Sequence, residues 1–492
     1  MALERLFRDL SERGKSMSGK NVGLFIMTMF ICLILGACSN QSNTEDLSSD
    51  DFFTIGEADD QTGNTEKFDK ILQLIHDWVE DGEIVGAQLL VIENRNILIH
   101  ESYGWMDREM DMPMENDTIF RIRSMTKPIT GTAALMLVEQ GSLSLSDPVS
   151  KYLSSFDNDK SRMITIGHLI THTGGFSQPG CPKDFEDYGS LREAVDDIGI
   201  VGPEVEPGTM YIYSDAGVAV LGAVIAEITG MPVEEFIQKN IFEPLAMTDT
   251  FCTLESQPDK QSRIGATYLR MGDQYIKYWD NSKSPLVPYF RASGGVYATA
   301  MDYAKFLYMW LNDGKLDSKQ FFSEHLVSQA LQPNGFSNHY GYLWEVENAF
   351  GHGGSDGTIG FAIPNENIIV LYFTQSRSTH TTEVVKSMVL EEFGLSTAVR
   401  HAIVNVDPSI YQDYVGKYQH PQIILEITSD GEHLYLKTPD TSNQLFYPAS
   451  EDFFFHEILD IQLTFIKDDH GKTTGMIIHQ NGEDTEAVKI QQ

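Results

Sequence analysis

The sequence predicts an α+β fold in two parts, a large mixed body followed by a small antiparallel β module. Strand patterns occur early and late in the body with helical patterns between them, which predicts a sheet completed by both ends of the body. After about residue 400 the pattern changes to short alternating strands separated by turns. With 492 residues, 41% of them hydrophobic, the chain can build a substantial core.

The first elements of the body, which is assigned to residues 65–400, are a helix and a hairpin. Apolar residues recur at helical spacing from Phe68 to Trp78. The stretch GAQLLVIENRNILIHESYG then predicts two strands joined by a turn near Asn94. Later strands are expected at GGVYATA and NIIVLYFTQ.

The C-terminal β module is assigned to residues 401–492. Ile423, Leu425 and Ile427 alternate with other residues, and the alternation breaks at the turn signal Asp430-Gly431. The stretch LDIQLTFIKDDHGKTTGMIIHQ repeats the same sequence of strand, turn and strand. No residue of this module suggests a catalytic role.

The N-terminal residues 1–38 are predicted to be an export signal. The uncharged, mostly apolar run at 22–37 is short for a membrane-spanning helix and has the length expected of a secretory signal. It ends in LGAC, which resembles a bacterial lipobox, so cleavage before Cys38 and lipidation of its thiol are expected. The alternative is an uncleaved signal anchor. Either interpretation tethers the protein to a membrane, facing the periplasm or the cell exterior, and residues 39–64 form an acidic linker.

The charge of the chain restricts its partners. There are 35 Lys plus Arg residues against 71 Asp plus Glu, a formal net charge of -36. Such a surface repels phosphate backbones, so no nucleic-acid partner is expected. The oligomeric state is left open by the sequence.

Cysteine and histidine patterns give little support for a disulfide or a metal. After the signal, only Cys181 and Cys252 remain, and the sequence does not show whether they pair. There is no CxxC or HExxH motif. His168 and His172 are spaced i, i+4, but no third ligand accompanies them, so no metal site is predicted.

The stretch RIRSMTKPITGTAALMLVEQG places Ser124 and Lys127 three residues apart at the start of an expected amphipathic helix that stops at Gly141. A serine there lies at the positive end of the helix dipole. A lysine buried nearby would have a lowered pKa and could take the hydroxyl proton. The alternative is a helix cap beside a surface charge, and this motif alone leaves both interpretations open.

Longer segments decide between these interpretations. PMENDTIFRIRSMTKPITGTAALMLVEQGSLSLSDPVSKYL, ITIGHLITHTGGF and SGGVYATAMDYAKFLYMWLNDG resemble the serine β-lactamase and penicillin-recognising superfamily. The most similar branch contains class C β-lactamases, D,D-carboxypeptidases and related esterases, and the matches run across residues 68–395. The resemblance implies a β-lactamase/transpeptidase-like domain, an antiparallel sheet with a helical domain. It also implies a barrel-like C-terminal domain that shapes or covers the cleft or binds a wall component.

The stretch PGTMYIYSDAGVAVLGAVIAEITG resembles the Tyr-x-Asn element of this superfamily, with Tyr213 as its tyrosine. By this resemblance Tyr213 and Lys127 act as general acid and base for Ser124, and a phenolate form of Tyr213 is expected near the lysine. The third position is Asp215 instead of Asn, and a carboxylate only accepts hydrogen bonds. Asp215 is expected to pair with Lys127, to N-cap the following helix, or both, and to repel an incoming carboxylate.

The segment HGGS, comprising His352, Gly353, Gly354 and Ser355, aligns with the superfamily's Lys-Thr-Gly strand. The glycines would let a substrate approach the strand closely. By resemblance, the backbone N–H groups of Ser124 and Ser355 would form an oxyanion hole. His352 replaces a permanent cation with a group that titrates near neutrality, which favours esters or uncharged substrates.

These features predict a lipoprotein serine hydrolase that forms an acyl-enzyme on Ser124 without a metal or an organic cofactor. The expected substrate is a small ester or amide, or a cell-wall-derived molecule, and a carboxylesterase-like activity is the first choice. A D,D-carboxypeptidase or β-lactamase is the alternative. A different class of answer is an acylatable penicillin-binding sensor or a non-catalytic binding protein, although the presence of Ser124, Lys127 and Tyr213 argues against an inactive site.

Overall fold

The structure is a computed structural model. It describes residues 52–55, 65–178, 180–272, 274–283, 287–377, 379–396, 401–420, 423–438, 443–480 and 483–490. The predicted signal with Cys38, and most of the predicted linker, lie outside the described residues. The elements below all belong to one compact unit, Phe53–Gln492.

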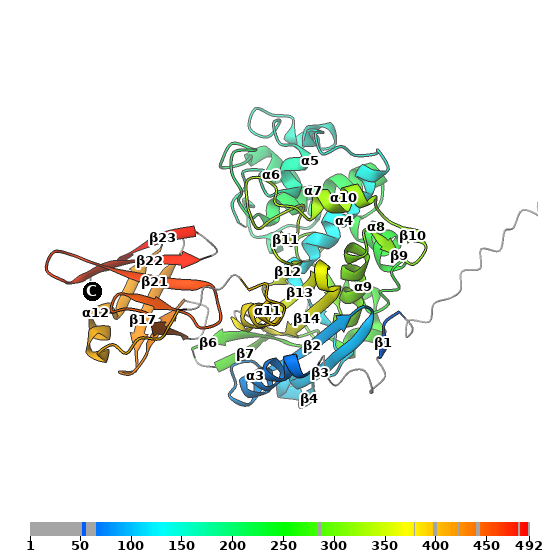
Figure 1. The fold of residues 1–492 in the computed structure, drawn as a ribbon. Helices are drawn as coiled ribbons and strands as arrows, with labels where there is room; N and C mark the ends of the chain where they lie inside the picture. Colours follow the sequence, from blue (N-terminus) through cyan, green and yellow to red (C-terminus); the bar gives the residue numbers. More distant parts are fainter. Residues whose placement is uncertain are drawn as a thin grey trace, which may run out of the picture. The chain divides into compact units, whose positions relative to one another are not determined.

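A largely antiparallel sheet forms the centre of the body (Figure 1). Its strands in spatial order are β1 (Thr54–Ile55), β3 (Asn96–Asp107), β2 (Gly86–Glu93), β14 (Ile368–Thr374), β13 (Thr358–Ile363), β12 (Phe350–Gly354) and β11 (Glu345–Val346). β1 runs parallel to β3, and the short β4 (Met112–Pro113) also pairs with β3. Because early strand β2 pairs with late strand β14, the prediction that both ends of the body complete the sheet is confirmed.

The first hairpin has the tight turn that the sequence predicts. Asn94 and Arg95 join β2 to β3 with φ values of 51° and 70°, the left-handed conformation that two-residue hairpin turns require. Strands β2 and β14 are buried along almost their whole length, so both faces of the sheet centre are covered.

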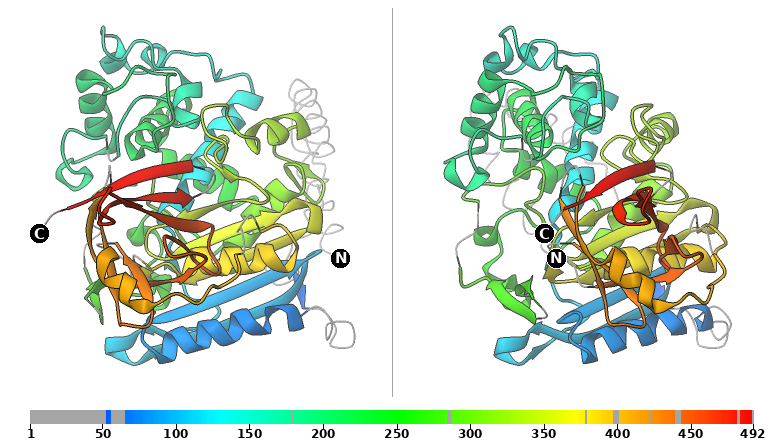
Figure 2. Two further views of the ribbon diagram at one scale, coloured as in Figure 1. Left: turned by 60° about the vertical axis from the view of Figure 1, so that its left-hand side comes forward. Right: turned by 90° about the vertical axis from the view of Figure 1, so that its left-hand side faces the viewer.

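Helices cover the two faces of the sheet. On one face, α3 (Asp69–Glu80) and α11 (Thr381–Glu392) contribute Ile71, Ile75, Val385 and Val389 to a core shared with the strands (Figure 2). On the other face, α9 (Ala300–Leu311) packs against β13 and β14. The site described below lies on the side of α9, where α4 (Thr126–Glu139) also begins.

Most remaining helices gather in the helical part of the body, at the top of Figure 1. They are α5 (Ile166–Ile170), α6 (Leu191–Val201), α7 (Asp215–Thr229), α8 (Val233–Ile237) and α10 (Glu324–Ala330). In the described part of the chain, no single helix is long and apolar enough to cross a membrane. One bent pair, Asp215–Thr229 with Val233–Phe242, meets the criteria by length and composition.

The expectation of an amphipathic helix after Ser124 is wrong. Every residue of α4 from Thr126 to Leu137 is buried, so the helix has no water-facing side over this length. The reason is its position, because α4 runs from the sheet into the helical part and packs against α7 and α8 there (Figure 1). Ser124 and Lys127 are therefore held by a core helix.

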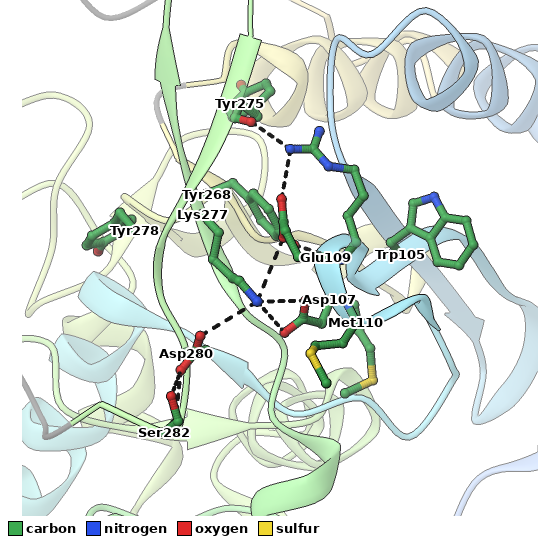
Figure 3. A network of polar contacts seen from close by, with 12 residues as sticks. Trp105, Asp107, Glu109, Met110, Tyr268, Tyr275, Lys277, Tyr278, Asp280 and Ser282 are labelled. Atoms are coloured by element: carbon green, nitrogen blue, oxygen red, sulfur yellow. Dashed lines mark hydrogen bonds and ion pairs between the residues drawn. The ribbon is translucent and has the colours of Figure 1, made fainter.

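A hairpin at the margin of the body carries Tyr278 and Trp279, two aromatic residues whose contacts near the site are described below. β6 (Thr267–Met271) pairs with β7 (Gln274–Trp279) and with β15 (Ser376–Arg377). Lys277 anchors the hairpin, since its Nζ lies 2.9 Å from both Asp107 oxygens, 3.8 Å from Glu109 and 3.6 Å from Asp280 (Figure 3). The shorter pairs are β5 (Phe120–Arg121) with β8 (Tyr297–Ala298), and β9 (Lys315–Leu316) with β10 (Lys319–Gln320).

The C-terminal module is a closed antiparallel barrel preceded by the short helix α12 (Tyr411–Tyr414). Its strands are β16 (Gly416–Gln419), β17 (Ile424–Ser429), β18 (Leu434–Lys437), β19 (Gln444–Pro448), β20 (Phe453–Phe455), β21 (Ile461–Lys467), β22 (Thr473–Gln480) and β23 (Glu483–Lys489). The alternating residues Leu425 and Ile427 face the barrel core, whereas Ile423 is exposed. The predicted fold class, an antiparallel sheet with helices plus a barrel, is confirmed.

Candidate active site

Ser124 lies in a single turn of 3-10 helix, Arg123–Met125, which leads directly into α4. Arg123 has a φ of 48°, a left-handed conformation that costs a non-glycine residue about 1–3 kcal/mol. Its guanidinium compensates, since Nε donates to Asp356 at 2.8 Å and Nη2 donates to the Tyr278 hydroxyl at 2.8 Å. The sharp turn before Ser124 is thus fixed by an ion pair and by the aromatic residue from β7.

Lys127 is completely buried, and its ammonium nitrogen holds three oxygens. Nζ donates to Ser124 Oγ at 2.9 Å, to Asp215 Oδ1 at 2.7 Å and to the Ser293 carbonyl at 3.1 Å. Burial lowers the pKa of Lys127 to about 8, an effect that Arg291 reinforces and the Asp215 carboxylate opposes. A substantial neutral fraction is therefore present just above neutral pH, next to the Ser124 hydroxyl.

Asp215 is the first residue of α7, but it does not cap the helix. Ser214 is the N-cap, and its hydroxyl accepts from the Gly217 amide at 3.3 Å, so the N-cap interpretation of Asp215 is wrong. The Asp215 carboxylate bridges Lys127 and Arg291, whose Nη2 donates to Oδ2 at 2.8 Å. Burial alone would raise the pKa of Asp215, but the two cations lower it to about 2.

Arg291 changes the expected electrostatics of this site. The carboxylate of Asp215 pairs with two cations, Lys127 and Arg291. Because its charge is balanced in this way, the expected repulsion of a substrate carboxylate is weakened. Arg291 also donates from Nε to the Ser293 hydroxyl at 2.9 Å, which fixes the loop whose carbonyl binds Lys127. Sequence reasoning misses Arg291, and the only signal is its position two residues before the SGG segment.

Tyr213 lies on the other side of Lys127. Its ring centroid is 4.6 Å from Lys127 Nζ, and the Ser124 side chain is within hydrogen-bonding reach of its phenol. Burial raises the pKa of Tyr213 well above its usual value. The expected phenolate is therefore disfavoured in the free protein, and Tyr213 stands beside Ser124 as a protonated donor.

His172 is hydrogen-bonded to the residues on both sides of Tyr213, Ile212 and Ser214. Its backbone carbonyl accepts from the Ile212 amide at 2.8 Å, and its Nδ1 accepts from the Ser214 amide at 3.2 Å. The His172 ring centroid also lies 4.7 Å from that of Tyr213. The residue therefore serves as a support for Tyr213, a role that the i, i+4 spacing does not indicate.

His168 does not share a site with His172. It belongs to a capping box at the start of α5, where its Nδ1 accepts from the backbone amide of Thr165. Among the described residues, no three His, Cys, Asp or Glu side chains gather where they would hold a metal ion. Cys181 and Cys252 are both free thiols.

His352 lies on β12, but it offers no free hydrogen-bonding group. The ring is 2% exposed, Nδ1 lies 2.7 Å from the Gly353 carbonyl and Nε2 lies 2.9 Å from the Tyr340 hydroxyl. Because a carbonyl only accepts, Nδ1 donates, and the neutral ring accepts from Tyr340 at Nε2. Burial lowers the pKa of His352, which favours the neutral ring over the cation, although Glu345 opposes this shift.

The two glycines after His352 have different surroundings. A Cβ at Gly354 would lie 2.3 Å from the Ile122 carbonyl oxygen and 2.3 Å from Thr358 Oγ1. Gly354 therefore lets β12 pack against the turn that carries Ser124, which is a structural demand and not a matter of substrate access. A Cβ at Gly353 would meet no atom closer than 3.8 Å, so the backbone there is approachable.

We expect alanine substitutions at these glycines to separate in stability. G354A should lower the free energy of unfolding by about 1–3 kcal/mol because the methyl group overlaps backbone and side-chain oxygens. G353A, the matched control, should change it by less than about 0.5 kcal/mol. Urea unfolding of both variants measures this. Equal losses would show that the packing of β12 on the Ser124 turn is not tight.

Ser355 follows β12 and is exposed, with its hydroxyl accepting from Arg377 Nη1 at 3.3 Å. The next residue, Asp356, is buried and has three arginines around it. Its carboxylate lies 3.7 Å from Arg121, 2.8 Å from Arg123 and 2.9 Å from Arg377. One carboxylate therefore orders the residues on both sides of the predicted oxyanion hole.

The chain is similar to several known proteins. The family model "Beta-lactamase" matches residues 71–393, and the model "Domain of unknown function (DUF3471)" matches residues 401–491. Penicillin-binding protein 4* of Bacillus subtilis (strain 168) is 25% identical over 456 residues, covering 85% of this chain and 98% of that protein.

An esterase is also among the relatives. Esterase EstB of Burkholderia gladioli is 33% identical over 189 residues, which is 35% of this chain and 48% of that protein. Among solved structures, the octameric penicillin-binding protein homologue from Pyrococcus abyssi superposes with a TM-score of 0.61 at 21% identity, covering 85% of this chain and 99% of that one. That similarity concerns the fold.

Proposed function

The chain belongs to the Beta-lactamase family, and from that premise we propose that it is a serine hydrolase that cleaves esters through an acyl-enzyme on Ser124. The observation that carries the proposal is the 2.9 Å contact between Ser124 Oγ and the buried Lys127 Nζ. A lysine whose pKa is about 8 can exist as the free amine and accept the hydroxyl proton.

The reaction begins when neutral Lys127 takes the Ser124 proton and Oγ forms a bond to the substrate carbonyl carbon. The developing oxyanion accepts hydrogen bonds from the backbone N–H groups of Ser124 and Ser355. As the bond to the leaving group breaks, Tyr213 donates its phenolic proton to the leaving oxygen, and Lys127 returns a proton to Tyr213. Water then attacks the acyl-enzyme with the same groups in reverse roles, which restores Ser124.

Esters are the preferred substrates in this proposal. The position that aligns with the superfamily's lysine is a buried neutral histidine, His352, so β12 offers no cation to a carboxylate on the leaving group. The similarity to an esterase supports the same choice. The predicted leader with Cys38 adds an exported, membrane-tethered location to the proposal.

A D,D-carboxypeptidase or β-lactamase activity is the second candidate. It is favoured by the similarity to penicillin-binding protein 4*, which extends over 85% of this chain. A third candidate is a sensor that is acylated once and not released. The sensor would use the same Ser124 and Lys127 but would not turn over.

The test is to compare p-nitrophenyl butyrate with a chromogenic cephalosporin on the full-length protein. We expect steady ester hydrolysis, no cephalosporin turnover, and an acyl adduct on the peptide that contains Ser124 in intact and digested mass spectra. Rapid cephalosporin turnover would replace the esterase with a β-lactamase. A burst of one equivalent without turnover would identify the sensor.

A further inference from the structure

A cavity of about 280 Å³ adjoins the Ser124 site. Arg123, the residue before Ser124, lines it, as does Arg291, whose guanidinium binds Asp215. Gly294 separates these two arginines, since a Cβ there would lie 3.5 Å from Arg291 Nη2 and 3.7 Å from the Arg123 carbonyl carbon. The cavity therefore opens between the turn that carries Ser124 and the loop that holds Lys127.

The charges around this cavity run against those of the whole chain. The protein carries a formal net charge of -36, but Arg121, Arg123 and Arg291 line the cavity against a single exposed acidic residue, Glu255. Behind the wall, Asp356 is shared by Arg121, Arg123 and Arg377. One carboxylate cannot neutralise three guanidinium groups, so positive charge is left over beside the cavity.

Asp215 does not remove this excess, because it is itself shared by Lys127 and Arg291. Five cations therefore depend on two carboxylates in this region. Concentrating like charges in a partly buried site is unfavourable unless an anion joins them. Such an arrangement is a common mark of a binding site.

Arg121 is the least satisfied of these cations. Its side chain is 8% exposed, and Nη1 has no hydrogen-bond partner within the described chain. The guanidinium stacks at 4.3 Å over the ring of Trp279, which β7 supplies. The neighbouring Tyr278 on the same hairpin is seen in Figure 3. The Trp279 ring holds the Arg121 guanidinium in place but offers no oxygen that could accept a hydrogen bond from it.

We propose that this cavity binds a carboxylate on the acid part of the substrate, so that the enzyme acts on esters whose acyl chain ends in a carboxylate. This inference rests on the proposed function and refines it, because the anionic group is held at the arginine-lined cavity and not at β12. The planar guanidinium fork matches a carboxylate with two parallel hydrogen bonds. The volume suits a short chain such as that of a four- or five-carbon diacid.

The test uses a matched pair of substrates on the full-length protein. These are p-nitrophenyl butyrate and mono-p-nitrophenyl glutarate, which differ by a terminal carboxylate. We expect kcat/KM to be higher for the glutarate ester by about tenfold or more, as a charged hydrogen bond provides. R121Q should reduce that preference about tenfold. R263Q is the control, since Arg263 pairs with Asp117 and Asp249, does not line the cavity and takes no part in the Asp356 and Asp215 pairs, and it should keep the preference.

A second measurement does not depend on the fold of R121Q. Glutarate should inhibit butyrate ester hydrolysis by the wild-type protein competitively, and 1,5-pentanediol should not. Titration of glutarate into S124A by calorimetry separates this inference from the proposed function. If glutarate binds S124A but the wild-type protein has no esterase activity, the proposed hydrolase function is wrong and the anion site stands. Ester hydrolysis without glutarate binding, or equal kcat/KM for both esters, would overturn the anion site alone.

Discussion

Replacing Ser124 by alanine is expected to lower kcat/KM for p-nitrophenyl butyrate by about 10⁴-fold or more. The substitution removes Ser124 Oγ, which lies 2.9 Å from Lys127 Nζ. This oxygen is the atom that would carry the acyl group. Transition-state binding by backbone donors remains, so a small residual rate above that of water is expected.

The measurement is steady-state kinetics of S124A beside S142A. Ser142 is an exposed serine just after α4, so its loss should leave the rate unchanged within twofold or so. Thermal unfolding of both variants checks that the fold is intact. Wild-type rates in S124A would rule out Ser124 as the nucleophile and with it the proposed mechanism.

Replacing Lys127 by methionine is expected to lower kcat by about 10³-fold, in the range that general bases contribute. Methionine keeps most of the buried volume but cannot accept a proton. The pH profile gives a second readout. The lysine acts in its neutral form and its pKa is about 8, so wild-type kcat/KM should rise with pH through about 8 and level off above it. K127M should lose this limb.

Lys305 offers a matched control for removing a buried lysine. Its side chain is 3% exposed and pairs with Asp302 at 2.9 Å within α9, just as Lys127 pairs with Asp215. K305M should therefore be less stable, because it breaks a buried ion pair. It should keep the rise of kcat/KM with pH that the wild-type protein shows. If K305M and K127M lost activity equally, the effect would be one of folding and Lys127 would not be the base.

The fold was predictable where local pattern decides it. The hairpin of β2 and β3 and the alternating strands of the barrel both follow from turn residues and spacing. α4 was harder, because its sequence contains enough polar residues to suggest a water-facing side. Tertiary packing buries Thr126, Thr130 and Thr132, which the sequence alone would leave exposed. Their hydroxyls bond to the Val296 amide, the Ala292 carbonyl and the Trp310 indole.

The site was predictable where a motif carries it. Ser124, Lys127, Tyr213 and Asp215 come together as their motifs imply, although Ser214 is the residue that caps α7. The helix start has two good capping residues in succession, so spacing does not choose between them.

The residues that support these groups were not predictable. Arg291 meets Asp215 across 76 positions of the chain, and Arg123 meets Asp356 across 233. Such pairs depend on tertiary structure that no local pattern encodes. His172 is similar, because its contact with Ser214 spans 42 positions and its spacing from His168 suggests an unrelated role.

The two borders of the central sheet bear on how the protein avoids self-association. In the described chain the sheet ends at β1 on one side and at β11 on the other, and each of these strands has only two residues. Unpaired backbone at a sheet border is a template on which another chain can add a strand, and very short border strands present little of it. The barrel has no border at all because it closes on itself. Both devices leave little unpaired backbone on which a second copy of the chain could add a strand.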